Sequence, residues 1–114
     1  MGLTKKELFT DTQNTLSDLA KVLGHPARIA ILDHLLKCKE CITGDIVQET
    51  GLAQATISQH LKELKSIGII KGSIEGTAVC YCIDSVRWEE IKHLFLNFFG
   101  KNNSEGTCCQ PLTI

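Results

Sequence analysis

One stretch of the sequence, residues 51–68, constrains the fold more than any other. Its sequence is GLAQATISQHLKELKSIG, and the apolar residues Ile57, Leu61, Leu64 and Ile67 recur at spacings of three and four. This spacing predicts a helix with one apolar side that packs on a core. On its own, the pattern is equally typical of a DNA-recognition helix and of an ordinary amphipathic surface helix, so the flanking sequence must decide between them.

The polar side of this predicted helix has side chains suited to the major groove of DNA. Its outward positions are Ala55, Gln59, Lys62 and Ser66, flanked by Thr56 and Ser58. Glutamine can form two hydrogen bonds with adenine, Ser and Thr hydroxyls can contact bases or phosphates, and lysines bind phosphates. This composition is compatible with a helix that binds in the groove.

The chain has 114 residues and a formal net charge of -1. This length supports one domain with one hydrophobic core, and the charge gives no overall basic bias toward nucleic acid. Between residues 53 and 76, Lys62, Lys65 and Lys71 outnumber Glu63 and Glu75 only slightly. We therefore expect modest, salt-sensitive DNA affinity that depends on dimer geometry and base contacts.

The sequence shows no run of about 18 apolar residues, and its beginning, MGLTKKELF, lacks the apolar core of a signal peptide. We therefore expect a cytoplasmic protein without a membrane partner. Six cysteines in such a protein favour reduced thiols, metal ligands or a redox switch over a disulfide scaffold.

Two helices are predicted before the middle of the chain. Residues 4–23 have an apolar stripe and contain neither proline nor an internal glycine, and Gly24 ends the helix. The second helix begins at His25-Pro26, because proline is tolerated in the first turn, and ends at about Lys37 or Cys38.

A short third helix is predicted from about residue 43 to residue 50, where Gly51 permits the chain to reverse. Together with the next helix it forms a helix-turn-helix over about residues 43–67. Ala53 stands where a capping Ser is expected, so the recognition helix is predicted to begin without a side-chain cap.

After residue 68, two short runs rich in β-forming residues flank Glu75-Gly76 and predict a β-hairpin, or wing, over about residues 69–83. A last helix is predicted over residues 85–99 with Ser85 as its N-cap. Its broad apolar stripe consists of Trp88, Ile91, Leu94, Phe95, Phe98 and Phe99. A small domain cannot easily cover this much apolar surface alone, so we infer a dimer interface shared with the helix at residues 4–23.

These elements, in this order, resemble the ArsR/SmtB family of dimeric winged-helix, metal-sensing repressors. The similarity covers about residues 19–99, and its most specific parts are Leu23-Gly24-His25-Pro26-Ala27-Arg28 and the run from Gln54 to Gly68. The resemblance implies a mainly α fold with a small β-hairpin, namely five helices plus a wing within a single domain of residues 1–100. Residues 101–114 are expected to form a flexible, cysteine-containing tail.

The resemblance also implies a homodimer that represses transcription from an inverted-repeat operator in double-stranded DNA and is released by a ligand. We find no nucleophile and base pair, phosphate-binding loop or carboxylate dyad, so we expect no enzymatic activity.

The family's DNA-facing positions fall on the predicted recognition helix and wing. They are Gln54, Ala55, Thr56, Ser58 and Gln59, with Lys62, Lys65 and the wing residue Lys71 for phosphates. His60 matches a histidine that the family often has. Helical periodicity places it beside the apolar face, so a half-buried packing role is favoured over base contact.

The ligand-binding pattern departs from the family's two common ones. The arsenite sensors often have Cys-x-Cys-x-x-Cys on the first helix of the helix-turn-helix, where this chain has only Cys41, with Cys38 just before it. The zinc sensors use Asp and His pairs on the terminal helix, where this chain has only Asp84 and His93. A lone His gives zinc little support there.

Two adjacent thiols, Cys108 and Cys109, can chelate a soft, thiophilic ion. Cys41 or Cys38 would supply the third thiolate of a trigonal site, so arsenite or antimonite is the expected effector and no obligatory cofactor is expected. The alternative is that the tail cysteines have no specific role.

Cys80 and Cys82 share one face of the predicted second wing strand. The favoured interpretation is that both are small buried residues. If the segment before the third helix joins the wing sheet, Cys38 and Cys41 would approach them and complete a four-thiolate zinc or cadmium site. A further alternative is a thiol redox or persulfide sensor with the same fold.

Overall fold

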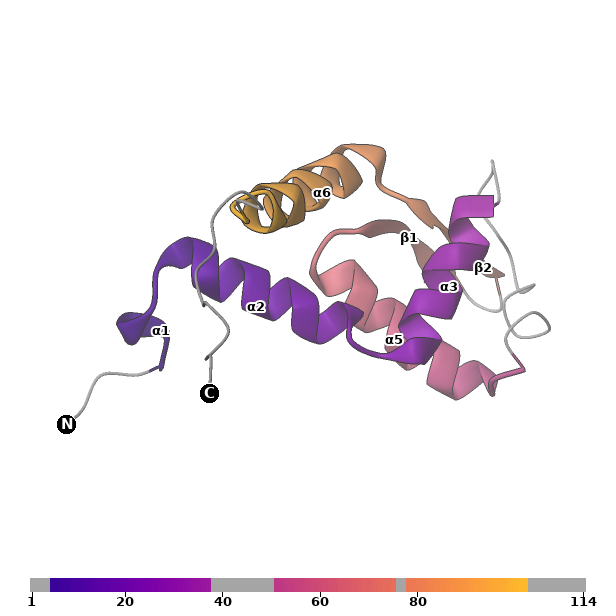
Figure 1. Ribbon diagram of the computed structural model, residues 1–114. Coiled ribbons are helices and arrows are strands. Elements are labelled where there is room, and N and C mark those ends of the chain that lie inside the picture. The colour runs from indigo at the N-terminus through magenta and orange to yellow at the C-terminus, as the bar shows by residue number, and fades with distance from the viewer. Residues whose placement is uncertain (1–4, 38–50, 76–77, 103–114) are drawn as a thin grey trace, which may run out of the picture.

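A computed structural model describes residues 5–37, 51–75 and 78–102 of the chain. The elements along the chain are α1 (Lys5–Leu8), α2 (Asp11–Leu23), α3 (Pro26–Lys37), α5 (Gln54–Ser66), β1 (Ile70–Glu75), β2 (Ala78–Ile83) and α6 (Ser85–Phe99) (Figure 1). The mainly α fold with one β-hairpin is therefore confirmed. The predicted third helix, at residues 43–50, lies outside the described residues.

The helix expected at residues 4–23 is in fact two helices, so that prediction was wrong. Thr10 begins α2 as its N-cap, with an extended backbone (φ -72°, ψ 160°). Its hydroxyl accepts a hydrogen bond from the Gln13 backbone N–H (3.1 Å), and its own backbone N–H donates to Gln13 Oε1 (2.9 Å). Because the backbone of an N-cap residue is not helical, the capping box at Thr10 separates α1 from α2.

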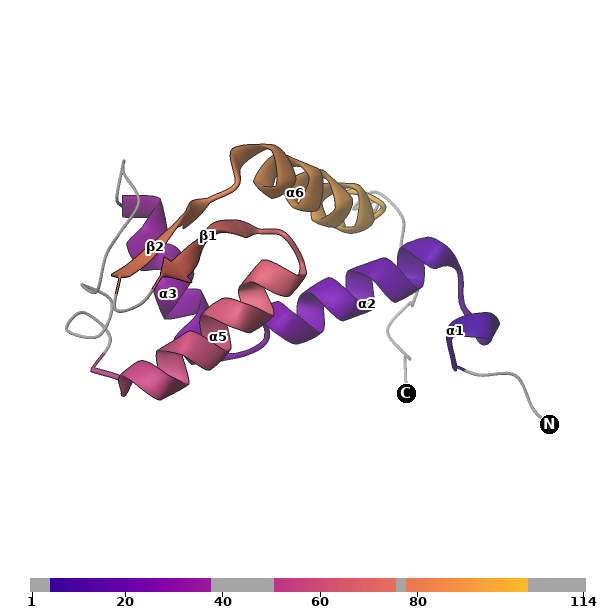
Figure 2. The ribbon, with the colours of Figure 1, turned by 180° about the vertical axis from the view of Figure 1, so that it is seen from behind.

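The hydrophobic core lies where α2, α3, α5, β1 and α6 meet. α2 contacts α3, α5 and α6, while α3 contacts α5 and β2 (Figure 2). The most deeply buried large side chains are Ile31, Leu61, Leu64, Ile69 and Ile70. Leu61 and Leu64 belong to the apolar stripe predicted for the recognition helix, so the inner side of that helix was correctly placed.

The wing is a two-stranded antiparallel sheet in which Ile70 pairs with Ile83 and Glu75 pairs with Ala78. Gly72 has a φ of 135°, and a Cβ atom there would lie 1.9 Å from the Cys80 carbonyl oxygen. Only glycine satisfies both the backbone angle and the close contact with the opposite strand.

The terminal helix α6 has Asp84 as its N-cap, so the prediction of Ser85 was wrong by one residue. The Asp84 carboxylate accepts a hydrogen bond from the Arg87 backbone N–H at 3.1 Å. Asp and Ser cap helices about equally well, and the local backbone selects between the two. α6 then crosses over α2 (Figure 1). None of the helices in the described residues is long and apolar enough to cross a lipid bilayer.

Candidate nucleic-acid interface

The recognition helix α5 has a buried side and an exposed polar side. Ile57, His60, Leu61 and Leu64 are buried. The residues predicted to face DNA are exposed, except that Ser58 is half-buried; the exposed ones on this helix are Gln54, Ala55, Thr56, Gln59, Lys62 and Lys65. The helix therefore presents amide, hydroxyl and ammonium groups to solvent along one side.

The N-terminal end of α5 lacks a side-chain cap, as the sequence predicts. Ala53 has an extended backbone (φ -64°, ψ 146°) and makes no capping hydrogen bond through its side chain. The first N–H groups of a helix have no intrahelical acceptor, and the helix dipole places partial positive charge there. This end of the helix therefore favours a phosphate of the DNA backbone.

The two lysines nearest the wing have different surroundings. Lys65 Nζ donates a 2.7 Å hydrogen bond to the Gly72 carbonyl oxygen, which ties α5 to β1. Lys71 is exposed on β1 and lies opposite Cys82 in the sheet register. Lys65 therefore connects α5 to β1 within the described part of the chain. To contact a phosphate, its ammonium group would have to break or share the hydrogen bond to the Gly72 carbonyl oxygen.

His60 is packed against the chain instead of facing solvent, and it is more deeply buried than the half-buried position expected from helical periodicity. Its side chain is 8% exposed, and its Nδ1 accepts a 3.1 Å hydrogen bond from Arg28 Nε. The ring lies 4.5 Å, centroid to centroid, from that of His25. Burial lowers the pKa of His60 below its ordinary value, and the nearby His25 and Arg28 act in the same direction. The buried ring is therefore held neutral, which suits an acceptor of the Arg28 bond.

Arg28 and Arg87 are structural residues that the sequence did not reveal as such. Arg28 Nη1 also donates to the Val22 carbonyl oxygen at 3.1 Å, so it joins the end of α2 to α5. Arg87 Nε donates to the Ile67 carbonyl oxygen at 2.9 Å, joining α6 to the end of α5. Arg28 at least lies within a motif that resembles the family's, whereas no sequence signal marks Arg87.

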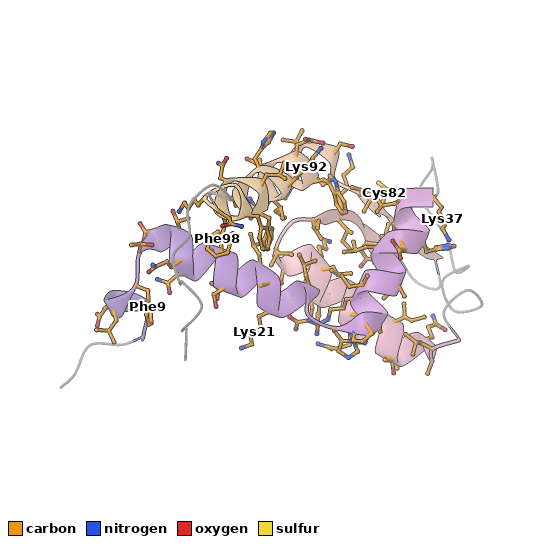
Figure 3. All side chains as sticks on the ribbon, viewed as in Figure 1. Phe9, Lys21, Lys37, Cys82, Lys92 and Phe98 are labelled. Atoms are coloured by element: carbon orange, nitrogen blue, oxygen red, sulfur yellow. The ribbon has the colours of Figure 1, made fainter. Side chains whose placement is uncertain are left out.

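The cysteines in the described residues are on the wing. Cys80 is exposed and Cys82 is half-buried, so the interpretation of both as small buried residues was wrong. Tyr81, between them, points to the other face and is buried, which follows from the alternation of a strand. β2, which carries Cys82 (Figure 3), contacts α3.

The remaining proposed thiolate ligands, Cys38, Cys41, Cys108 and Cys109, lie outside the described residues. Among the residues that are described, no group of three or more His, Cys, Asp and Glu side chains could hold a metal ion. Asp84 caps α6, and the exposed His93 has its Nε2 atom 3.9 Å from a carboxylate oxygen of Glu89.

Several large apolar side chains are exposed on the N-terminal region, α3 and α6. They are Leu8, Phe9, Ile29, Leu36, Val86, Leu96, Phe98 and Phe99. Ile29, Leu36, Leu96 and Phe99 belong to a groove of about 510 Å³ between α3 and α6, whose lining also includes Leu32, Ile69, Trp88 and Phe95.

A helix with an exposed polar face beside a β-hairpin is typical of winged-helix DNA-binding proteins. Comparison with known proteins agrees with this class. The family described as bacterial regulatory protein, arsR family, matches residues 25–71. The solution structure of the homodimeric winged helix-turn-helix DNA-binding domain Mb0332 from Mycobacterium bovis has a TM-score of 0.59 at 21% identity, covering 94% of this chain and 97% of that chain.

Two relatives in sequence are named as repressors. The arsenical resistance operon repressor of Staphylococcus xylosus is 29% identical over 103 residues, which cover 85% of this chain and 90% of the relative. The transcriptional repressor PagR of Bacillus anthracis is 32% identical over 75 residues, 66% of this chain and 75% of the relative. The chain therefore belongs to the ArsR family, whose members are DNA-binding transcriptional regulators and not enzymes.

Proposed function

We propose that this protein is a homodimeric repressor that binds an inverted-repeat operator in double-stranded DNA and is released by a thiophilic metalloid, arsenite. The observation that supports it most directly is the exposed polar side of α5, beside the wing, in a chain of the ArsR family. On this side Gln54, Thr56, Ser58 and Gln59 contact base edges or phosphates, and Ala55 provides an apolar contact.

The phosphate contacts come from exposed lysines on either side of this surface. Lys62 lies on the outer side of α5 and Lys71 on the wing, and both are exposed. Lys65 is the weaker candidate because its ammonium already donates to the Gly72 carbonyl oxygen. Burial and the hydrogen bond from Arg28 support a packing role for His60 over base contact.

The homodimer is supported by the exposed apolar surface. Phe9, Leu96, Phe98 and Phe99 are each more than half exposed, and Phe99 reaches 67%. Phe9 and Phe98 lie toward the end of the molecule away from the wing (Figure 3). Several exposed large apolar side chains, together with the apolar groove between α3 and α6, mark an interaction site. Two protomers joined here would present both α5 helices to successive major grooves, about one helical turn apart.

Arsenite is supported by the cysteine content and by one relative. Arsenite is thiophilic, and Cys108 and Cys109 with Cys41 would provide three soft thiolate ligands. The relative from Staphylococcus xylosus is named as an arsenical resistance operon repressor and is similar over most of both chains. Antimonite, which shares this coordination chemistry, would act at the same site.

A second sensor site is favoured by the exposure of the wing cysteines. Cys80 is exposed and Cys82 half-buried, on one face of β2, and Lys71 lies opposite Cys82 in the register. Metal binding and oxidation both need thiols that an ion or an oxidant can reach. With Cys38 and Cys41 these thiols would form a zinc or cadmium site, and by themselves they would act as a redox or persulfide sensor.

These alternatives are separated by one titration series. An operator is first selected from a random DNA library, and its binding is then followed by fluorescence anisotropy with arsenite, antimonite, cadmium, zinc or peroxide added separately. Replacing Cys108 and Cys109 by Ser should abolish the arsenite response, whereas replacing Cys80 and Cys82 by Ser should leave it intact. The reverse pattern would move the sensor site to the wing, and failure of every ligand to lower DNA affinity would contradict the sensor function.

The DNA-binding surface is tested by two substitutions on the same helix. Gln59→Ala should reduce discrimination against altered operators by roughly 1 to 3 kcal/mol, the range for a bidentate base contact. Lys62→Ala should weaken binding to all DNA about equally and reduce the salt dependence. Equal effects of the two substitutions on sequence preference would contradict the assigned faces of α5.

A further inference from the structure

We propose that Arg87 is the positioning residue through which the terminal helix α6 controls the recognition helix α5. The proposal rests on the proposed function, since it describes how a change at the dimer surface reaches the DNA-binding surface. Arg87 lies on the first turn of α6 and is half-buried. It does not belong to the set of residues proposed to contact DNA or the effector.

The guanidinium group of Arg87 completes the C-terminal end of α5. Its Nε donates a 2.9 Å hydrogen bond to the carbonyl oxygen of Ile67, the C-cap residue of α5. Carbonyl groups at the end of a helix lack intrahelical donors, and the helix dipole places partial negative charge there. A cationic donor from another helix therefore satisfies this carbonyl and favourably offsets the dipole.

The aliphatic part of the same side chain packs on the turn that follows α5. A Cβ atom on Gly68 would lie 3.3 Å from Arg87 Cγ and 3.5 Å from Nε, so the side chain passes directly over this glycine. Gly68 has a φ of 78°, which ends α5 and directs the chain into β1. Arg87 thus contacts both the last carbonyl of α5 and the residue that sets its exit.

Asp84 fixes the position from which Arg87 reaches α5. Its carboxylate accepts the Arg87 backbone N–H at 3.1 Å, and its own backbone N–H donates to the Ile69 carbonyl oxygen at 3.0 Å. Two bonds from the start of α6 therefore end on residues 67 and 69. A guanidinium nitrogen of Arg87 also lies 3.7 Å from Glu90 Oε1, but Glu90 is exposed to solvent and this pair contributes little.

The other end of α6 belongs to the surface proposed for the second protomer. Leu96, Phe98 and Phe99 are all exposed there, while Ile91, in the middle of the helix, is buried in the core. A helix transmits a displacement along its length, because its backbone hydrogen bonds make it stiff. A shift of α6 at the dimer surface would therefore move the Arg87 guanidinium and, with it, the end of α5.

The test compares Arg87→Met, which keeps much of the aliphatic chain but removes the donor and the charge, with Arg87→Lys, which keeps the charge but has no Nε–H. Glu90→Gln is the matched control, because it removes the exposed ion pair and leaves the Ile67 bond. Thermal unfolding of each variant checks that the fold is retained. Arsenite and cadmium are the probes, and arsenite binding to each variant is measured directly.

In the wild-type protein, arsenite or cadmium should raise the Kd for operator DNA. Both Arg87 variants should bind the ion with the affinity of the wild type. The ratio of the Kd values for operator DNA with and without the ion should fall by about 10-fold, which is within the usual range of coupling between two sites. Glu90→Gln should keep the wild-type ratio. A wild-type ratio in both Arg87 variants would overturn the proposal.

A second measurement needs no effector and so separates this proposal from the identity of the ligand. Coupling between two sites is reciprocal, so operator DNA should slow amide hydrogen exchange in residues 85–91 of the wild-type α6. In Arg87→Met this protection should disappear while protection of α5 by DNA remains. If neither ion affects DNA binding, the proposed effector is wrong and the exchange result still decides on Arg87. Unchanged α6 protection in the variant, or none in the wild type, would overturn the coupling.

Discussion

Replacing Arg28 by Ala tests whether the contact between α3 and α5 stabilises the fold. The Arg28 guanidinium donates 3.1 Å hydrogen bonds to His60 Nδ1 and to the Val22 carbonyl oxygen. Both acceptors lie in a part-buried region, and His60 itself is 8% exposed. The substitution leaves both acceptors without this donor, and water can reach the His60 ring only with difficulty.

The expected loss of stability follows from these two bonds. A hydrogen bond from a charged donor contributes about 1.5 to 3 kcal/mol, and a half-buried site lies toward the lower end because solvent replaces part of the interaction. We therefore expect Arg28→Ala to lower the free energy of unfolding by about 2 to 4 kcal/mol. For a domain of this size that corresponds to a fall in Tm of roughly 8 to 17 °C.

The free energy of unfolding is measured by urea unfolding followed by circular dichroism. All variants are compared at one protein concentration, because the stability of a dimer depends on concentration. A double-mutant cycle with His60→Leu isolates the pair, and its coupling energy should be at least about 1 kcal/mol. Arg28→Lys, which keeps the charge without the guanidinium fork, should lose about half as much stability as Arg28→Ala. A loss below about 0.5 kcal/mol for Arg28→Ala, or a coupling energy near zero, would refute the reasoning.

Three other perturbations follow from single features of the structure. Because burial lowers the pKa of His60 below 6.5, the unfolded chain binds the proton first as pH falls. The free energy of unfolding should therefore be highest above about pH 6.5 and decrease as the pH falls from there toward the lower pKa of the folded state. His60→Leu should remove this decrease, which urea unfolding at pH 7.5 and 5.5 measures. Gly72→Ala should destabilise the wing by at least about 2 kcal/mol, because Gly72 has a positive φ and the added Cβ would clash with the backbone of β2. Affinity for the operator should fall as a result, and an unchanged affinity would contradict a role for the wing in DNA binding. Thr10→Ala should cost about 1 kcal/mol by removing the α2 cap, while Thr10→Ser should be nearly neutral.

The elements that the sequence predicted well are those defined by local signals. The apolar spacing of Ile57, Leu61 and Leu64 placed the inner side of α5, and β-forming runs placed both wing strands. The break at Thr10 was missed, although Thr10 and Gln13 have the spacing of a capping box. The residues on both sides of Thr10 are compatible with one continuous helix. The spacing of apolar residues alone does not reveal that one helix ends and another begins there.

The features that sequence reasoning missed depend on contacts between distant positions. Arg28 and His60 are 32 positions apart, and Arg87 and Ile67 are 20 apart. Helical periodicity places His60 near the apolar side but does not identify its donor. The alternation along β2 placed Cys80 and Cys82 on one face, but both faces have residues that can be buried. Only the docking of the wing against the core, with Tyr81 turned inward, decides which face is exposed.

The contacts around α5 explain how one helix can be held firmly and still leave its polar side open to DNA. Arg28 holds it from α3, Lys65 ties it to the wing, and Arg87 holds its C-terminal end from α6. The last two bonds use the backbone carbonyls of Gly72 and Ile67 as acceptors, which no side-chain substitution removes. The donors are therefore the positions at which mutation can release α5. Because Arg87 alone of the three donors belongs to a proposed dimerisation helix, a dimer rearrangement should displace it directly, whereas Arg28 would be reached only through its bond to the Val22 carbonyl oxygen of α2.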